Sequence, residues 1–502
     1  MSAPEKNNEE TNENKNQSTL EPAQEDNTEA NEYRNNLDKV QRDNPADTTV
    51  YDNDNYDVAS VYTLKGELSQ YIDRSESSLY HEYYPGIESV QYNYILERQN
   101  PYSTNFLESM SHLIKSCLGA GILGMHEGFM YAGIWTSLVT VFILGLFIPY
   151  SMLMLVTCAQ KMYVKIRVPK LTYADLAEAA IATGPLKPCR RLSKTFRYIV
   201  DFCLFLQLCG TCCIYEIMIA DTLKQVIETA SKQNFSLRIY IVISMIPLLV
   251  LTLIRSLKYL APFALVADLF VAVCIITTMY YSIAVASDIR DRPAWKNFHG
   301  LIEFCGVCIY SMDGIPIVLA VENNMNTPQY IKHVILYGMT IVVIAVTITG
   351  FFGYWAWGES CRTPITTHMP MEMLPIILRF LLVGMLAVTF AVQFWVPFRT
   401  VWHYIGKNCL RKRACWERFY RLLQVVAITA VALIFPNMIK LMIFMGDFFL
   451  AFITFIFPAL ININVTWNEH KPRTIRWSCI KDVAIILFGV VLCVGSLYSL
   501  FD

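Results

Sequence analysis

The feature that most constrains this chain is a series of about eleven long apolar segments between residues 106 and 500. A segment needs roughly 20 apolar residues to cross a bilayer as a helix, and most of these segments reach that length. Inside a membrane every backbone polar group must be satisfied internally, which a helix achieves alone. We therefore predict an all-α integral membrane protein with spans at residues 106–130, 134–158, 197–222, 239–254, 260–286, 301–322, 333–357, 374–398, 422–436, 438–464 and 482–500.

The charges divide the chain into two parts. Residues 1–104 carry 21 acidic and 8 basic residues, whereas the rest carries 21 acidic and 33 basic ones. The first part is rich in Asn, Glu, Asp and Ser and holds too little apolar surface to offset the entropy of ordering. We predict a disordered acidic tail over residues 1–104 and a transmembrane domain over 105–502. A net charge of −1 gives no indication of nucleic-acid binding, and none is expected.

The loops predict how the chain is oriented in its membrane. Basic residues are concentrated in the loops 159–196, 399–421 and 465–481, which lie on one side if there are eleven spans. Because basic loops mark the cytoplasmic side, the N-terminus is expected in the cytoplasm and the C-terminus outside or in a lumen. Asn234-Phe235-Ser236 is a glycosylation sequon in a loop placed outside, so Asn234 is the predicted glycosylation site.

The first span is interrupted by glycines. Gly119, Gly121 and Gly124 fall within six residues, and each glycine costs about 1 kcal/mol relative to alanine inside a helix. His112 and Lys115 lie just before them. A broken membrane helix beside ionisable groups is typical of transporter sites near the bilayer midplane.

A second interruption occurs in the sixth span, at Ser311-Met312-Asp313-Gly314-Ile315-Pro316. Pro316 removes a backbone donor, and Gly314 lowers the helical propensity. Spans one and six hold corresponding positions in two halves of five helices, as expected for an inverted repeat. The two breaks in register predict a single solute site formed by both spans.

The chemistry of two such breaks suits a zwitterion. Freed N–H groups at a half-helix N-terminus attract a carboxylate, and freed carbonyl groups accept an ammonium. We predict that the breaks and the residues beside them form the substrate site. The candidate substrate-binding residues are Ser116, Leu118, Gly119, Ala120, Gly121, Tyr310, Ser311, Asp313 and Gly314.

Ionisable residues inside spans are costly and are therefore candidates for function. They are His112, Lys115, Asp201, Asp221, Asp268, Asp313, Glu322 and Asp447. Asp201, Asp221 and Glu322 lie near predicted helix ends, where solvation or pairing is easy, and for Asp268 and Asp447 structural pairing is an alternative to transport. His112 is the candidate for proton coupling because its ordinary pKa lies near neutral pH. The alternative for His112 is a hydrogen-bonded histidine at a helix interface.

The motifs give no support for catalysis. His126-Glu127 is not followed by the second histidine of a zinc-protease motif, and no phosphate-binding loop is present. Cys209, Cys212 and Cys213 lie in an apolar span without further ligands at metal-site spacing, so we interpret them as packing residues. We expect no enzyme activity, no catalytic residue, no metal and no cofactor.

At these residues the chain resembles the proton-coupled amino acid transporter family of the amino acid/auxin permease superfamily. The family's first span usually reads His-Leu-Leu-Lys-Gly-Asn-Ile-Gly-Thr-Gly-Leu-Leu-Gly-Leu-Pro, which is similar to residues 112–126. Val200-Asp201-Phe202 and the rest of the third span are also similar, as are Ser311-Met312-Asp313-Gly314 and Val321-Glu322-Asn323. The resemblance covers about residues 104–502.

The resemblance implies a LeuT-like fold of five plus five inverted-repeat helices with one extra C-terminal helix. It further implies a symporter of small neutral amino acids and protons, in the plasma membrane or in endolysosomal membranes, with His112 at the position of the family's proton-linked histidine. The departures are Cys117 and Ala120 in place of Asn and Thr, Met125-His126 in place of Leu-Pro, and Asp313 in place of Glu. An alternative hypothesis is an amino-acid sensor whose tail captures a cytoplasmic partner.

Overall fold

The computed structural model describes residues 93–98, 103–185, 187–231, 234–254, 272–273, 275–285, 288–370, 372–405, 413–467 and 472–501. In these ranges the regular structure is helical, and the only β pairing is an isolated bridge between Thr104 and Met325. The predicted all-α class is confirmed. Most of the predicted tail and Asp268 of the predicted fifth span lie outside the described residues.

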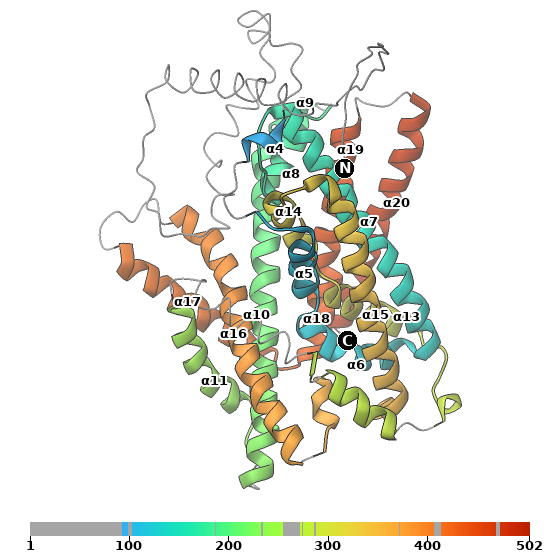
Figure 1. The fold of residues 1–502 in the computed structure, drawn as a ribbon, viewed down its shortest axis with the longest axis vertical. Helices are drawn as coiled ribbons and strands as arrows, with labels where there is room; N and C mark the ends of the chain where they lie inside the picture. Colours follow the sequence, from blue (N-terminus) through green and yellow to red (C-terminus); the bar gives the residue numbers. More distant parts are fainter. Residues whose placement is uncertain are drawn as a thin grey trace, which may run out of the picture. The chain divides into compact units, whose positions relative to one another are not determined.

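The α-helices include long membrane-length elements and shorter half-helices (Figure 1). In chain order they are α4 (Tyr94–Glu97), α5 (Phe106–Cys117), α6 (Met125–Ala132), α7 (Ile134–Ile166), α8 (Tyr173–Ala182), α9 (Lys187–Arg190), α10 (Ser193–Ser231), α11 (Leu237–Thr252), α13 (Phe298–Ser311), α14 (Ile315–Asn324), α15 (Ile331–Trp357), α16 (Met373–Ile405), α17 (Arg413–Ile434), α18 (Met438–Phe444), α19 (Phe457–Thr466) and α20 (Pro472–Phe501).

Tighter and wider turns connect or interrupt these helices. The 3₁₀ turns are η3 (Ala120–Gly124), η4 (Ile289–Asp291), η5 (Pro328–Tyr330), η6 (Gly358–Ser360) and η7 (Ile365–His368). Two π-helical turns, η9 (Met445–Leu450) and η10 (Phe452–Ile456), lie between α18 and α19. Such π turns are rare and occur frequently at functional sites.

Seven stretches in the described part of the chain are long and apolar enough to cross a membrane. They are Ile134–Ile166, Ser193–Thr229, Phe298–Asn324, Pro328–Ser360, Met373–Trp402, Met438–Thr466 and Cys479–Tyr498, with shorter apolar helices at Leu237–Thr252 and Ile275–Val285. The first predicted span is not in this set, and its break divides it into α5 and α6. Helix α17 covers the predicted span 422–436 and carries charged residues in its first half.

The two predicted breaks are present in the structure. Helix α5 ends at Cys117, Gly119 is non-helical, and the chain continues as the η3 turn. Helix α13 ends at Ser311, and α14 begins at Ile315 with Pro316 in its first turn. The second break therefore comprises only residues 312–314, because the candidate residues Tyr310 and Ser311 still belong to α13.

The half-helices pack inside a layer of long helices. Helix α13 lies against α6 and η9, and α15 crosses α5, α6 and α7. Figure 1 shows the long α10 running alongside α16, and these two helices are in extensive contact. Large apolar side chains remain exposed on both long and shorter apolar helices, as expected for surfaces that face lipid: Leu146, Ile246, Ile276 and Leu487.

Hydrogen bonds define the two ends of the bundle. At one end, here called the tail side, α4 meets the C-terminal end of α14 and the loop 167–172. At the opposite end, the far side, the loop 289–297 meets the connection between α6 and α7. Gly133 makes that connection with a φ of 96°, and an added Cβ would lie 2.8 Å from the carbonyl oxygen of Pro293. Only glycine fits there without strain.

We expect Gly121→Ala to destabilise the detergent-solubilised protein by about 1–3 kcal/mol, the usual effect of overpacking. The added Cβ would lie 2.6 Å from the Cα atom of Ser311, so backbone would have to move. Gly384→Ala is the matched control, because nothing lies within 4 Å of its added methyl group. The control should be neutral or stabilising by up to about 1 kcal/mol. Equal unfolding midpoints for both variants would contradict the close approach.

Candidate functional site

The two helix breaks lie directly against each other. An added Cβ at Gly121 would lie 2.6 Å from both the Cα and the Oγ atoms of Ser311. At Gly314 it would lie 2.7 Å from the Sγ atom of Cys117 and 3.2 Å from a methyl group of Leu113. Each break therefore contacts the other span through a glycine, and segments about 190 residues apart in the sequence form one site.

Unpaired backbone groups converge at this contact. Ala120 and Gly121 are the first residues of the η3 turn. Their N–H groups therefore have no carbonyl acceptor within that turn. In the described part of the chain, no acceptor is found for the N–H groups of Asp313 and Gly314. The carbonyl groups in the last turns of α5 and α13 lie at the same contact between the two breaks. The site therefore offers donors and acceptors at the ends of four half-helices.

Helix α10 supplies a third wall. Gln207, Thr211 and Tyr215 are spaced by four residues and therefore share one face of the helix. The Gln207 side-chain amide donates to Oδ2 of Asp313 at 2.9 Å, and Thr211 donates to the Gln207 side chain at 3.0 Å. The Tyr215 hydroxyl lies 2.8 Å from the position of a Cβ on Gly119.

These α10 residues were missed as site residues by the sequence analysis. Their signal was present as a four-residue spacing of polar side chains in an apolar span. No local pattern around these residues indicates that this face is directed at both breaks.

The candidate side chains of the first break take local partners. The Ser116 hydroxyl donates to the carbonyl of Leu113 at 2.8 Å, within its own helix. Ala120 and Gly121 are buried, whereas Leu118 and Gly119 are partly exposed. His112 lies on the exposed side of α5, and no hydrogen bond to its ring is found within the described ranges. The structure therefore brings the backbone of the first break into the site and leaves His112 on the helix surface.

The candidate side chains of the second break are more deeply placed. The Ser311 hydroxyl donates to the Val307 carbonyl at 2.7 Å, and Tyr310 lies near Thr211 and Tyr215. Asp313 is partly buried, and its Oδ1 atom has no hydrogen-bond partner among the described residues. Asp313 therefore retains an oxygen with which to bind a ligand. Asn234, the predicted glycosylation site, is exposed in a non-helical segment.

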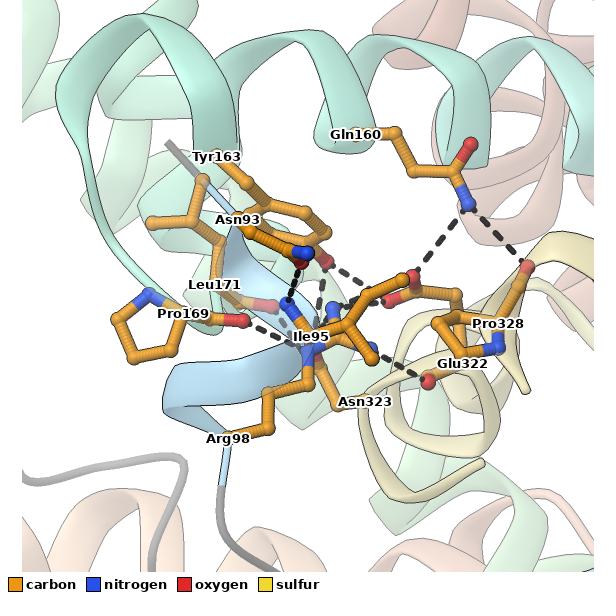
Figure 2. A network of polar contacts seen from close by, with 10 residues as sticks. All are labelled: Asn93, Ile95, Arg98, Gln160, Tyr163, Pro169, Leu171, Glu322, Asn323 and Pro328. Atoms are coloured by element: carbon orange, nitrogen blue, oxygen red, sulfur yellow. Dashed lines mark hydrogen bonds and ion pairs between the residues drawn. The ribbon is translucent and has the colours of Figure 1, made fainter. Parts of the chain in front are cut away.

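On the tail side, Arg98 joins the end of the predicted tail to α14 (Figure 2). Its guanidinium group donates to both carboxylate oxygens of Glu322, at 2.9 and 3.1 Å, and to the backbone carbonyl of Glu322 at 3.0 Å. It also donates to the carbonyl of Pro169 at 2.8 Å. Arg98 is only 7% exposed and Glu322 is fully buried, so this ion pair is shielded from water.

Side chains of α7 complete the tail-side network. The Tyr163 hydroxyl lies 3.0 Å from a carboxylate oxygen of Glu322 and 3.1 Å from the side-chain oxygen of Asn323. Gln160 bridges Glu322 and the carbonyl of Pro328, and Asn323 donates to the carbonyl of Leu171. Figure 2 shows these groups converging on the Glu322 carboxylate. Residue Glu322, predicted to be solvated or paired near a helix end, is paired.

The other acidic residues that were expected near helix ends are also hydrogen-bonded. Asp201 accepts from the hydroxyl of Tyr404 at 2.8 Å, and Asp221 accepts from Gln225 at 2.8 Å. A hydrogen-bond partner on α16 therefore accounts for Asp201, and one on its own helix accounts for Asp221.

On the far side, α6 is attached to the segment that connects α15 to α16. The Glu127 carboxylate accepts from the N–H of Thr363 at 2.6 Å, and the Nε2 atom of His126 donates to the carbonyl of Arg362 at 3.0 Å. The Nε2 atom of His368 accepts from the N–H of Arg362, and its ring stacks on Trp357. A cavity of about 410 Å³ lies nearby, lined by Glu127, Asp221, Arg238, Arg362, Asn437 and neighbouring residues.

Comparisons with known proteins agree with this arrangement. Residues 103–501 match the family described as "Transmembrane amino acid transporter protein". The "Proton-coupled amino acid transporter-like protein pathetic" of Drosophila melanogaster is 31% identical over 399 residues, covering 78% of this chain and 84% of that protein. "Amino acid transporter AVT3B" of Arabidopsis thaliana is 26% identical over 428 residues, covering 81% and 95%.

A solved structure supports the fold. The inward-facing conformation of Mhp1 matches 80% of this chain and 92% of its own, with a TM-score of 0.51 and 12% sequence identity. At this identity the likeness shows the fold alone. The predicted LeuT-like fold is confirmed, and the number of eleven spans stays a prediction.

We expect Arg98→Ala to destabilise the protein by about 3–5 kcal/mol, because it leaves the buried Glu322 carboxylate without its cation. Arg290→Ala is the control, since Arg290 is exposed in the far-side loop and should change stability by less than about 0.5 kcal/mol. Glu322→Gln should reduce the effect of Arg98→Ala in a double-mutant cycle of thermal unfolding. Additive effects of the two substitutions would mean that the ion pair contributes nothing.

We expect acidification to weaken the far-side segment through His368. Burial lowers the pKa of His368 to about 4 from an ordinary value of 6.5, so the unfolded chain takes up this proton first. The stability contribution is fully present above pH 6.5 and is lost as the pH falls toward 4. His368→Gln keeps an acceptor for Arg362 but does not titrate, so its unfolding midpoint should fall less over this pH range. His333→Gln, at an exposed histidine, should behave as the unmodified protein does.

Proposed function

Because the chain belongs to the transmembrane amino acid transporter family, we propose that it is a proton-coupled symporter of small neutral amino acids such as glycine, alanine and proline. The family and the fold make it a secondary transporter of amino acids. The observation that carries the finer proposal is the contact of the two glycine breaks, with its unpaired backbone groups.

The two breaks provide complementary charge for a zwitterion. The N–H groups at the start of η3 and in the Asp313–Gly314 segment would bind the carboxylate, because half-helix N-termini carry partial positive charge. The last carbonyls of α5 and the free oxygen of Asp313 would bind the ammonium group. The Asp313 carboxylate, held by Gln207, would add a directed acceptor.

The narrowness of the contact favours small substrates. Gly121 lies against Ser311 and Gly314 against Cys117, so the space beside the backbone is limited to small side chains. Cys117 and Ala120 stand where the family usually has Asn and Thr, so recognition would depend on backbone groups more than on polar side chains. Glycine, alanine and proline meet both conditions.

We assign proton coupling to His112, whose position on α5 precedes the first break by one and a half turns. The Drosophila relative is named as proton-coupled transporter-like, which supports a proton as the driving ion. Protonation of a histidine near a half-helix would change the field at the break and so favour one orientation of the site.

Two sets of contacts would act as gates for alternating access. The Arg98–Glu322 network would hold the tail side, and the Glu127–Thr363 contact would hold the far side. Opening one set while keeping the other would expose the central site to one side of the membrane at a time.

The orientation follows from the basic loops. We propose a cytoplasmic tail side, a far side that faces the exterior or a lumen, and glycosylation at Asn234. The membrane would be the plasma membrane or an endolysosomal membrane.

Uptake of radiolabelled glycine, alanine and proline into proteoliposomes tests the proposal. We expect a pH gradient to drive accumulation, and we expect His112→Ala to remove most of that accumulation while leaving exchange of substrate at equal pH. His333→Ala is the matched control, because His333 is an exposed histidine at the start of another apolar helix. Uptake of all three amino acids that ignores the pH gradient would overturn proton coupling, and absence of uptake would overturn the substrate class.

A further inference from the structure

A second ionisable group lies deep in the bundle, away from the two helix breaks. Asp447 belongs to the π turn η9, nine residues after α18 begins at Met438 on the far side. At 1.5 Å per residue this places it roughly 13 Å along the span, close to half of a hydrocarbon core of about 30 Å. Structural pairing was the alternative expected for this residue from the sequence.

The structure shows no such pairing. Asp447 is 0% exposed, and neither of its carboxylate oxygens has a hydrogen-bond partner among the described residues. The carboxylate lies against Gly306 of α13, where an added Cβ would be 2.6 Å from Oδ2. Gly446 packs against the carbonyl group of the same Gly306. These two glycines allow the backbones of η9 and α13 to approach closely beside the Asp447 carboxyl group.

Among the described residues, the groups that interact with Asp447 carry no positive charge. Helix α13 presents Glu303, Cys305 and Cys308, and α20 presents Cys493. The elements α10, α18 and η10 also pack near η9, and none of their titratable groups in the described ranges interacts with Asp447. An ionised Asp447 would be a buried, unpaired anion beside another acid, at a cost of several kcal/mol.

Two ionisable residues of α13, His299 and Glu303, lie between the far-side end of this helix and Gly306, which contacts the Asp447 carboxyl group. The carboxylate of Glu303, on α13, interacts electrostatically with Asp447. The Nδ1 atom of His299 lies 3.6 Å from a carboxylate oxygen of Glu303. The His299 side chain is 37% exposed and that of Glu303 is 14% exposed, so accessibility decreases from the helix end toward Asp447. Chains of Asp, Glu and His inside membrane proteins are typical of proton pathways.

We infer that Asp447 is a proton-binding site of the transport cycle, loaded from the far side through His299 and Glu303. In the arrangement described here the carboxyl group holds one proton on an Oδ atom. When α13 moves away from η9, water reaches the carboxyl group, the O–H bond breaks, and the proton leaves to water as Asp447 ionises. The proton thus stabilises the packed arrangement and is released from the separated one.

This inference rests on the proposed function for its role in transport, but the protonation itself does not. The two parts can therefore be tested separately. Asp447→Asn is the informative variant, because the amide has nearly the shape of a protonated carboxyl group and cannot release a proton. Asp482→Asn is the matched control: Asp482 is 1% exposed, but it accepts from Asn462 at 2.7 Å and has Lys481 beside it.

The first arm measures protonation by infrared spectroscopy of the purified full-length protein near pH 7. We expect a C=O stretching band of a protonated carboxyl group that disappears in Asp447→Asn and persists in Asp482→Asn. Loss of the band in Asp447→Asn alone supports the site even if the protein transports none of the amino acids offered. A spectrum unchanged by Asp447→Asn would overturn the inference.

The second arm measures radiolabelled alanine in proteoliposomes. We expect the Asp447→Asn variant to exchange alanine when the pH is equal on both sides. Its accumulation of alanine under a pH gradient should be at least about tenfold lower than that of the unmodified protein. A factor of ten corresponds to about 1.4 kcal/mol of coupling free energy. Asp482→Asn should retain both activities. A variant Asp447→Asn that accumulates alanine as the unmodified protein does would show that Asp447 is a structural residue. If the unmodified protein does not move alanine, the substrate proposal fails and the infrared arm decides the proton site.

Discussion

The contact between the backbones of two broken helices is the constraint on which the rest of this structure depends. A membrane allows non-helical backbone only where protein or a water-lined cavity covers it. Here each break is covered by the other, through Gly121 on Ser311 and Gly314 on Cys117. Either break alone would leave its free N–H and C=O groups facing apolar side chains. The inverted repeat is therefore an energetic requirement of the site as well as a pattern in its topology.

The sequence predicted the features that depend on local propensity. Four glycines and one proline were sufficient to place both breaks, and the apolar lengths predicted a helical membrane fold. The second break begins two residues later than Tyr310, the first candidate residue there, because the Ser311 hydroxyl bonds to its own helix and helps α13 continue. The candidate backbone positions do meet in the structure, since glycines are needed both to end the helices and to let them approach.

Contacts between distant segments could not be predicted in the same way. Nothing near Gln207 in the sequence indicates that it binds Asp313, about a hundred residues away. The pairing of Arg98 with Glu322 is equally non-local, and the tail composition favoured disorder over a buried arginine. For Asp447 the sequence left pairing and transport as alternatives, and packing against a glycine leaves its oxygens unpaired among the described residues. Such outcomes depend on tertiary packing, which pattern and propensity do not contain.

The Arg98 network shows that the folded bundle and the region matched by the family begin at different residues. The family match begins at residue 103, but the bundle uses a guanidinium group five residues earlier to neutralise a carboxylate on α14. A chain trimmed to the matched region would keep the described membrane helices and still contain an uncompensated buried charge on the tail side. The folded bundle therefore begins before the region that matches the family. Residues 93–98 are part of the folded bundle. A fusion or deletion that leaves the fold intact therefore has to be made before residue 93.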